Sequence, residues 1–113
     1  MEMTIHSGLT PETAASKFAA LGSEQRLAVL DVLVRAGSEG LPIGVLGERC
    51  GISGSTLTHH LKILAAAGLV TQSRQGRSII CAGADYAEVR ALSDYLLRHC
   101  CADASCATEH SHG

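Results

Sequence analysis

Three cysteine thiols fall within seven residues near the C-terminal end of the sequence, at Cys100, Cys101 and Cys106. Thiolates are soft ligands that select soft ions, and trivalent arsenic and antimony prefer three sulfurs in a pyramid. The cluster therefore predicts a site for arsenic(III) or antimony(III). Successive side chains of a helix point about 100° apart, so a helix that contains Cys100 and Cys101 must unwind at its end before both sulfurs can bind one ion.

The same thiols could also respond to other ions or to oxidants. Zinc and cadmium are alternative ions, and reactive sulfur or an oxidant would instead form a persulfide or a disulfide. Cys100 also continues an apolar helical pattern, so it can be a core residue. His99, His110 and His112 can add nitrogen ligands for zinc or copper, although histidines in a polar tail are more often solvated.

A second group of polar residues shares one predicted helix, which has Ser53 as its N-cap and Gly68 just past its end. An apolar stripe at positions i, i+4 and i+7 of this helix is formed by Leu57, Leu61 and Leu64. The groups that can donate to phosphates or base edges are carried by Ser55, Thr56, Thr58, His59 and Lys62. They predict a DNA-binding face, with an ordinary solvated face as the alternative. His60, at the edge of the stripe, is expected to be a partly buried structural residue.

Two short β-like runs, residues 69–73 and 78–81, follow this helix and flank a possible hairpin tip. Gln75-Gly76 suits the tight turn, because glycine adopts positive φ at no steric cost. Arg74 and Arg77 lie at either side of the tip, where they can neutralise phosphates or reach into a minor groove. The alternative is a solvated hairpin that contacts no nucleic acid.

The charge distribution supports a nucleic-acid partner, although the formal net charge is −2. Residues 1–49 carry six acids and four bases, and residues 85–113 carry five acids and two bases. Residues 50–84 carry three bases and no acid. Because the local sign of charge decides how a surface meets phosphates, this middle segment is expected to be the recognition unit.

Length and composition predict one domain with an aliphatic core. The 113 residues include only three aromatic side chains, and no run reaches the ~18 apolar residues that a membrane span needs. The N-terminus lacks a basic and apolar signal region, so we expect a cytoplasmic protein with no membrane partner. Five cysteines, an odd number, favour free thiols over a disulfide framework. Cys50 and Cys81 follow apolar patterns and are expected to be packed thiols.

Hydrophobic periodicity predicts a mainly α-helical fold with a small β-hairpin, in the order α-α-α-α-β-β-α. Thr10-Pro11 reads as an N-cap followed by proline at the first helical position. The helices predicted before the hairpin cover residues 11–21, 24–36, 42–50 and 54–67. The third and fourth of them form a helix-turn-helix, to which the hairpin adds a wing.

Two of the helices carry apolar stripes that predict their packing. In the second helix, the residues expected on the core face are Leu27, Leu30 and Val34, with Val29 and Leu33 beside them. The last helix starts near Asp85, and its stripe consists of Val89, Leu92, Leu96 and Cys100, with Tyr86 and Leu97 adjacent. This organisation predicts a loose arm over residues 1–10, a winged helix-turn-helix domain over residues 11–101, and a flexible tail over residues 102–113.

Four stretches carry a family resemblance: Leu21-Gly22-Ser23-Glu24-Gln25-Arg26-Leu27, Ser53-Gly54-Ser55-Thr56-Leu57-Thr58-His59-His60-Leu61-Lys62, Ala67-Gly68-Leu69-Val70 and Arg74-Gln75-Gly76-Arg77. Together they resemble the ArsR/SmtB family, the winged-helix metal- and metalloid-sensing repressors of bacteria. The resemblance covers about residues 12–100. It implies a homodimer in which the first and last helices pair the protomers on a near-palindromic double-stranded DNA operator.

Within that family, the cysteine cluster resembles the arsenite-responsive repressors that have an adjacent pair plus a third cysteine near the end of the last helix. The chain departs from the older arsenic pattern, because residues 43–48 contain no Cys-x-Cys. It also departs from the zinc-sensing pattern, because Asp94 is followed by Tyr95 and Leu96 and not by a second-position histidine. The resemblance thus implies a repressor that needs no cofactor to bind DNA and that arsenic(III) or antimony(III) releases.

Two other classes of function make different demands. A thiol-dependent arsenate reductase needs a cysteine-headed phosphate loop closed by an arginine, and no cysteine here opens such a loop. We therefore expect no enzyme. A dimerisation module without DNA contact would keep the same fold, and a salt-dependent gel shift would separate it from a repressor.

Overall fold

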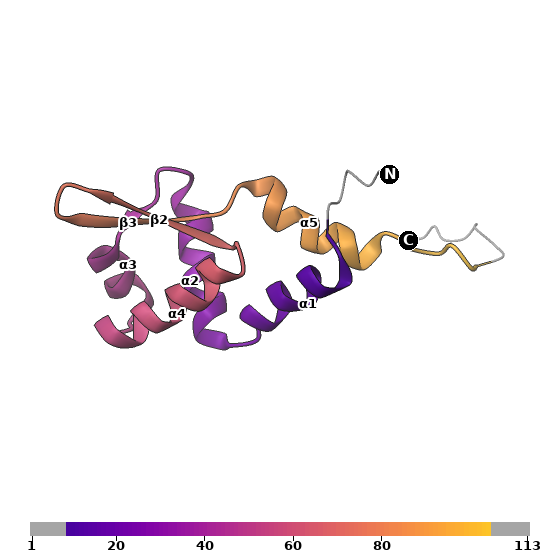
Figure 1. Ribbon diagram of the computed structural model, residues 1–113, viewed down its shortest axis with the longest axis horizontal. Helices are drawn as coiled ribbons and strands as arrows, with labels where there is room; N and C mark the ends of the chain where they lie inside the picture. The colour runs from indigo at the N-terminus through magenta and orange to yellow at the C-terminus, as the bar shows by residue number, and fades with distance from the viewer. Residues whose placement is uncertain (1–8, 105–113) are drawn as a thin grey trace.

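The computed structural model describes residues 9–104, which form five helices and a three-stranded sheet. The elements are α1 (Pro11–Ala20), α2 (Glu24–Ala36), β1 (Leu41–Pro42), α3 (Ile43–Cys50), α4 (Gly54–Ala66), β2 (Val70–Gln75), β3 (Ser78–Gly83) and α5 (Tyr86–Leu97). Figure 1 shows α1 and α5 together at one end of an elongated molecule, with α3 and the hairpin tip at the other. The predicted winged helix-turn-helix, mainly helical with a small hairpin, is confirmed.

The helix starts follow the capping residues of the sequence. The Thr10 hydroxyl accepts a hydrogen bond from the Thr13 amide, and Pro11 occupies the first turn, as predicted. The Ser23 hydroxyl accepts from the Arg26 amide at the start of α2. Ser53 has the extended backbone of an N-cap, but its hydroxyl makes no capping hydrogen bond. The N-cap position of α4 was therefore predicted correctly without the interaction that usually stabilises it.

The core is aliphatic and centres on leucines from four elements. The largest fully buried side chains are Leu33, Leu46, Leu61, Leu64, Leu69, Val29 and Cys81. The predicted leucine stripe of α4 is buried as expected. The predicted face of α2 is partly wrong, because Leu27 and Val34 are 51% and 54% exposed while Val29 and Leu33 are buried. Helix α2 carries two overlapping apolar stripes, and the one that meets α3 and β3 is the one that is buried.

The sheet is antiparallel with strand order β1-β3-β2. The sequence did not predict β1, because its two residues show no periodicity and one is Pro42, which lies on the edge of the sheet opposite Ile80. The hairpin is longer than predicted, and its turn lies one residue later, at Gly76-Arg77 between the paired residues Gln75 and Ser78. Gly76 has φ +63°, at the position where type II′ turns place glycine.

Helix α5 begins after Asp85 as predicted but ends at Leu97. Only Leu92 of its predicted stripe is buried, and Leu96 is 66% exposed. Cys100 lies beyond the helix, in a series of turns, so it does not continue the stripe. The prediction for Leu96 and Cys100 is therefore wrong for a single chain, because α5 packs mainly against α1 and little of its surface reaches the core. Within residues 9–104, no helix has the length and apolar character that a membrane crossing requires.

Gly40 supports the junction between α2 and the sheet, and its replacement should be costly. A Cβ atom at Gly40 would lie 2.3 Å from the Cys81 carbonyl oxygen, and the residue has φ +74°. We expect Gly40→Ala to lower the free energy of unfolding by about 3 kcal/mol, from the left-handed backbone and the clash together. Gly51→Ala is the control, because Gly51 has φ +69° but open space around it, and should cost about 1 kcal/mol. Equal losses in urea unfolding would contradict the role of the close approach.

Candidate functional site

The outer face of α4 carries the five residues predicted to contact DNA. Ser55, Thr56, Thr58, His59 and Lys62 are all exposed. On the opposite face, Leu57, Leu61 and Leu64 are buried and fix how the helix is turned. The turn before α4 is equally defined, because Gly51 has the left-handed conformation and Ile52 is buried. The arrangement presents a row of hydrogen-bond donors on one rigid helix.

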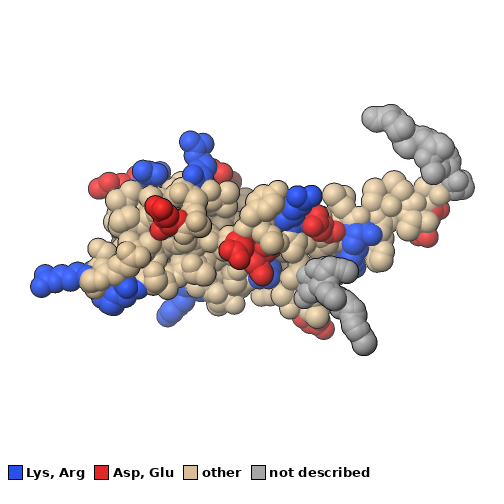
Figure 2. Space-filling model, turned by 90° about the horizontal axis from the view of Figure 1, so that it is seen from above, with Lys and Arg blue, Asp and Glu red and all other residues tan. Residues whose placement is uncertain are grey.

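The two wing arginines lie on the hairpin. Arg74 belongs to β2, opposite Ile79, and Arg77 lies in the turn itself; both are exposed. Helix α4 packs against β2, so the hairpin and the helix belong to one unit. Figure 2 shows basic side chains projecting at the end of the molecule that carries the hairpin, with a few acidic ones nearby. The cationic segment predicted from sequence is thus assembled, with its charges reaching outward.

His60 is only 7% exposed and lies between two residues of α2, which confirms that it is a structural histidine. Its Nδ1 lies 3.3 Å from Arg26 Nη1, and its Nε2 lies 2.9 Å from Gln25 Oε1. An arginine only donates, so Nδ1 must accept and the proton must reside on Nε2, which donates to Gln25. Arg26 Nε also donates to the Ala20 carbonyl at 2.6 Å. His60 therefore ties the middle of α4 to α2 and to the end of α1.

The sequence analysis assigned no role to Gln25 or Arg26. The available signal was their place in the stretch from Leu21 to Leu27 that resembles the family, within the same pattern as His60. Burial lowers the pKa of His60, and the charge of Arg26 and then that of His59 lower it further. The neutral imidazole is the form that this hydrogen-bond arrangement requires, because a protonated Nδ1 could not accept from Arg26.

Cys100 and Cys101 form an exposed thiol pair beyond α5. Their Sγ atoms lie 3.2 Å apart, although the residues are adjacent in sequence. Because α5 ends at Leu97, the chain has already left the helix, and Cys101 has φ +63°. The predicted unwinding of the helix end is therefore present. The hydrogen bond with Cys100, followed by the charge of Cys100, raises the pKa of Cys101, so Cys101 holds its proton more tightly than an isolated thiol would.

The third predicted thiol, Cys106, lies outside the described residues, as do His110 and His112. His99 is described and is exposed. Within residues 9–104, no three histidine, cysteine or carboxylate side chains gather into a group that could hold a metal ion. The three-thiolate site therefore remains a prediction, of which the structure describes two of the three sulfurs.

The other two thiols lie elsewhere in the fold. Cys81 is fully buried on β3, and Cys50 is half-buried at the end of α3. Burial raises the pKa of both thiols, and for Cys81 a hydrogen bond from Gln72 partly opposes the effect. Both are packed thiols, as predicted, and they lie apart from the thiol pair beyond α5.

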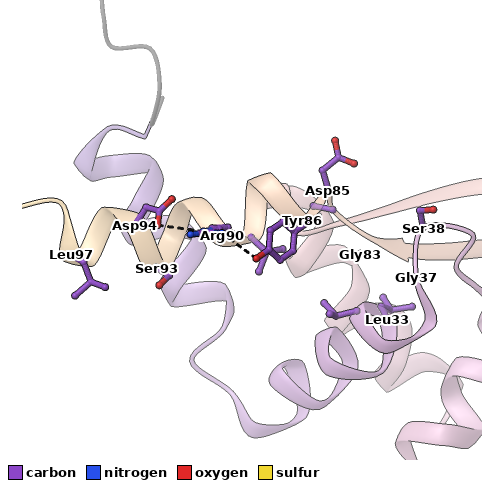
Figure 3. A pocket seen from close by; sticks show the side chains of 13 residues that line it. Leu33, Gly37, Ser38, Gly83, Asp85, Tyr86, Arg90, Ser93, Asp94 and Leu97 are labelled. Atoms are coloured by element: carbon purple, nitrogen blue, oxygen red, sulfur yellow. Dashed lines mark hydrogen bonds and ion pairs between the residues drawn. The ribbon is translucent and has the colours of Figure 1, made fainter. Parts of the chain in front are cut away.

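A groove of about 820 Å³ lies between the end of α2 and the length of α5. Figure 3 shows that Leu33 comes from α2, whereas Tyr86, Arg90 and Leu97 come from α5. The residues that line the groove include no cysteine or histidine, so it is separate from the thiol pair. Tyr86 and Leu97 are 76% and 62% exposed, which leaves apolar surface of α5 uncovered in the single chain.

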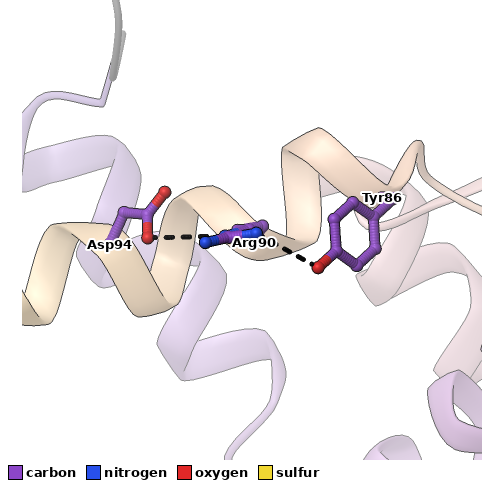
Figure 4. Close-up of polar contacts among 3 residues, drawn as sticks. All are labelled: Tyr86, Arg90 and Asp94. Carbon is purple, nitrogen blue, oxygen red and sulfur yellow. Dashed lines mark hydrogen bonds and ion pairs between the residues drawn. The ribbon is translucent and has the colours of Figure 1, made fainter.

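One wall of the groove is a polar row along α5. Arg90 lies between Tyr86 and Asp94, with Nη1 donating to the tyrosine hydroxyl at 3.3 Å and Nε 3.7 Å from the carboxylate (Figure 4). The three residues are one turn apart, as helical spacing of four residues requires. Such exposed pairs contribute little to stability.

Comparisons with known proteins agree with this architecture. A family model described as "Helix-turn-helix domain" matches residues 21–73. Over 64 residues the chain is 39% identical to the uncharacterized HTH-type transcriptional regulator YceK of Bacillus subtilis, covering 57% of this chain and 63% of that protein. An ArsR-like transcriptional regulator from Rhodococcus sp. RHA1 has 32% identity and a TM-score of 0.66, with 77% of this chain and 78% of that one covered.

A third similar structure is a homodimeric winged helix-turn-helix domain, Mb0332 from Mycobacterium bovis. It has a TM-score of 0.64 at 21% identity, over 81% of this chain and 94% of that one, and so bears on the fold alone. The chain matches between 52% and 63% of the length of its curated relatives. The segment that the family model matches, residues 21–73, includes the helix-turn-helix and not the thiol pair.

The buried histidine makes stability depend on pH. A lowered folded-state pKa means that the unfolded chain binds the proton better, so stability is complete above the ordinary pKa of 6.5 and declines as the pH falls below it. We expect the free energy of unfolding to decrease between pH 7.5 and 5.5, and less steeply in His60→Gln, which can still accept from Arg26. His99→Gln is the control, because His99 is exposed and lies beyond α5, and this variant should keep the wild-type slope. If the slope of His60→Gln matches that of wild type, the assignment fails.

Proposed function

Because this chain belongs to the ArsR family of winged helix-turn-helix proteins, we propose that it is a dimeric transcriptional repressor that arsenic(III) or antimony(III) releases from its operator by binding Cys100, Cys101 and Cys106. One observation carries the proposal: residues 50–84, which contain no acid, fold into an exposed donor face on α4 and a wing with two outward arginines. A helix of this kind fits a major groove without repelling phosphates, and the wing reaches the backbone or the minor groove.

The proposed signal rests on the thiol pair. Two sulfurs 3.2 Å apart on an exposed turn can both reach one soft ion with little rearrangement. Arsenous acid reacts with three thiols by forming three As–S bonds and releasing three molecules of water, so protonated thiols are suitable partners. Cys106 follows Cys101 after a spacer of four residues, which is long enough for the chain to fold back. This step needs no oxidant.

The proposed homodimer pairs the α1 and α5 helices of two protomers. Its support is the apolar surface of α5, where Leu96 and Leu97 are 66% and 62% exposed. Contiguous apolar surface on a soluble protein marks a contact with a partner. A similar fold in Mycobacterium bovis is a homodimer. Two-fold symmetry would set two α4 helices on successive turns of a near-palindromic site.

The proposed coupling follows from the position of the thiols. They lie directly beyond α5, so gathering them around an ion changes the end of the helix that pairs the protomers. The ion must bind the DNA-free state more tightly, and by linkage DNA must weaken ion binding by the same factor. Typical coupling free energies are about 1–3 kcal/mol.

A DNA-release titration of the reduced protein tests the proposal. The compounds to compare are arsenite, antimonite, methylarsenite, zinc, cadmium and peroxide. Release by arsenite and antimonite at the lowest concentrations supports the trivalent metalloid. Release by peroxide instead, reversed by a reductant, would favour a thiol redox sensor on the same fold. Failure to bind any duplex in a salt-dependent way would refute the repressor itself.

The wing and helix cations should carry the non-specific part of DNA affinity. We expect Lys62→Ala and Arg77→Ala to weaken binding to all duplexes, and to reduce the salt slope by about 1 for each phosphate that is no longer neutralised. Ser55→Ala and His59→Ala should instead change the preference between operator variants, because they remove donors and no fixed charge. Fluorescence anisotropy at several salt concentrations measures both effects. Unchanged slopes in both cation variants would place the DNA face elsewhere.

The cysteine variants should separate a three-thiolate site from a pair. Arsenic(III) needs all three sulfurs, whereas methylarsenite already carries a methyl group and needs two. We expect Cys106→Ser to raise the arsenite concentration for half-release at least about tenfold, a loss of ~1.4 kcal/mol, and to spare methylarsenite. Cys101→Ser should impair both responses.

The packed cysteines provide the matched controls for this series. Cys50→Ser and Cys81→Ser should respond to arsenite like wild type, although Cys81→Ser should be less stable because it buries a hydroxyl. DNA binding without ligand should be unchanged in all four variants. Equal loss of both responses in Cys106→Ser, or no loss of either, would disprove the three-thiolate site.

A further inference from the structure

Lys17 is a buried charge that the proposed function does not use. Its side chain is only 6% exposed, whereas lysine is among the residues least often buried. Its Nζ donates to the carbonyl of Ala67, 50 residues later in the chain. The ion pairs within residues 9–104 consist of Arg90 with Asp94, so no described carboxylate neutralises Lys17. A buried ammonium needs partners that offset its lost hydration.

The partner of Lys17 is the C-terminal end of α4. Ala67 is the C-cap of this helix, where unpaired carbonyls and the helix dipole concentrate negative charge. Helices α2 and α3 have Arg35 and Arg49 in their own last turns, whereas α4 and α5 have no basic residue there. Lys17 lies in the last turn of α1 but directs its Nζ to the end of α4. Lys17 therefore supplies, from α1, the cation that the end of α4 lacks in its own sequence.

The residue after the cap leaves room for this contact. Gly68 has φ +75°, and a Cβ atom there would lie 2.9 Å from Lys17 Nζ. A side chain at position 68 would therefore push the ammonium away from the carbonyl. The stretch Ala67-Gly68 thus combines the backbone conformation that ends α4 with the space that Lys17 occupies.

A second link joins the same two helices. Arg26 donates from Nε to the carbonyl of Ala20, the last residue of α1, and from Nη1 to His60 in the middle of α4. The two attachment points on α4, His60 and Ala67, are seven residues apart, or about 10 Å along the helix axis. Two separated points fix the direction of a rod, which a single point does not.

We propose that Lys17 is a positioning residue that holds α4, the helix proposed to enter the DNA groove, in a fixed orientation relative to α1. A shift of α1 would then move α4 with it. Helix α1 packs against both α5 and α4, which places it between the thiol end of the molecule and the DNA-binding face. This inference rests on the proposed function, because it assigns to Lys17 the alignment of α4 on an operator. The phosphate-binding cations are not involved in this link.

The test compares Lys17→Met, which keeps an apolar side chain of similar length, with Lys17→Arg, which keeps a cationic donor. Arg35→Met, on the exposed surface of α2, is the control for losing one positive charge. An operator duplex is first selected from a random pool with wild-type protein, and Kd values are then measured for it and for an unrelated duplex over a range of salt concentrations. Thermal unfolding is followed in parallel.

We expect Lys17→Met to weaken operator binding about tenfold, while binding to the unrelated duplex and the salt slope stay unchanged. Lys17→Arg should recover most of the operator affinity, and Arg35→Met should resemble wild type. Operator affinity like that of wild type in Lys17→Met would overturn the proposal. So would a parallel loss for both duplexes with a lowered Tm, which indicates a purely structural role.

A measurement without DNA separates this inference from the proposed function. If wild-type protein selects no duplex, the repressor proposal fails, but amide hydrogen exchange still reports on the contact. Lys17→Met should then speed exchange at the C-terminal end of α4 and in the two residues that follow it, residues 64–68, and leave α3 unchanged. Equal exchange rates in the two proteins would overturn the assignment of Lys17 whatever the function of the chain.

Discussion

The two-sided character of α4 is the constraint on which the rest of the structure depends. Leu57, Leu61 and Leu64 commit one face of the helix to the core, and only because of that can the other face display hydroxyls, an imidazole and an ammonium in a defined direction. The polar contacts refine this placement. His60 sets the rotation of α4 against α2, and Lys17 holds its C-terminal end, so the helix is fixed by apolar burial, one neutral ring and one buried cation.

The aliphatic core buries one full face of α4 but only one residue of α5 among those that the structure describes. Leu92 is the only residue of α5 that is buried within the described chain, while Tyr86, Leu96 and Leu97 remain exposed. Isolated helices of this length are marginal in water, so a helix with so little burial would gain stability from a partner. In the proposed dimer, the partner protomer would set the position of α5. That makes α5 a suitable place for a ligand to act.

The sequence predicted the elements whose signals are local and left open those that tertiary contacts decide. The start of α1 was predicted correctly from Thr10-Pro11, and the buried face of α4 from its leucine repeat, because capping and periodicity act within a few residues. The face of α2 was misassigned, because Val29-Leu33 and Leu27-Val34 are both plausible apolar stripes and only packing chooses between them. The strand β1 is too short to show a period.

In the candidate site, too, the local features were predicted from the sequence and the long-range contacts were missed. The donors of α4 and the wing arginines were predicted from spacing, and the structure places them on the exposed surface. The links from Lys17 to Ala67 and from Arg26 to His60 were missed, because they span 50 and 34 residues and no local pattern encodes them. Lys17 does share the apolar face of α1 with Ala14 and Phe18, and a lysine on such a face was the available signal.

The two-fold symmetry of the proposed dimer bears on the free energy available to the proposed switch. Shifting an equilibrium from 1:99 to 99:1 needs about 5.5 kcal/mol, more than the ~1–3 kcal/mol that one site usually supplies. Two identical thiol sites acting on one pair of α5 helices double that contribution, so a dimer can complete a transition that a single site would leave partial.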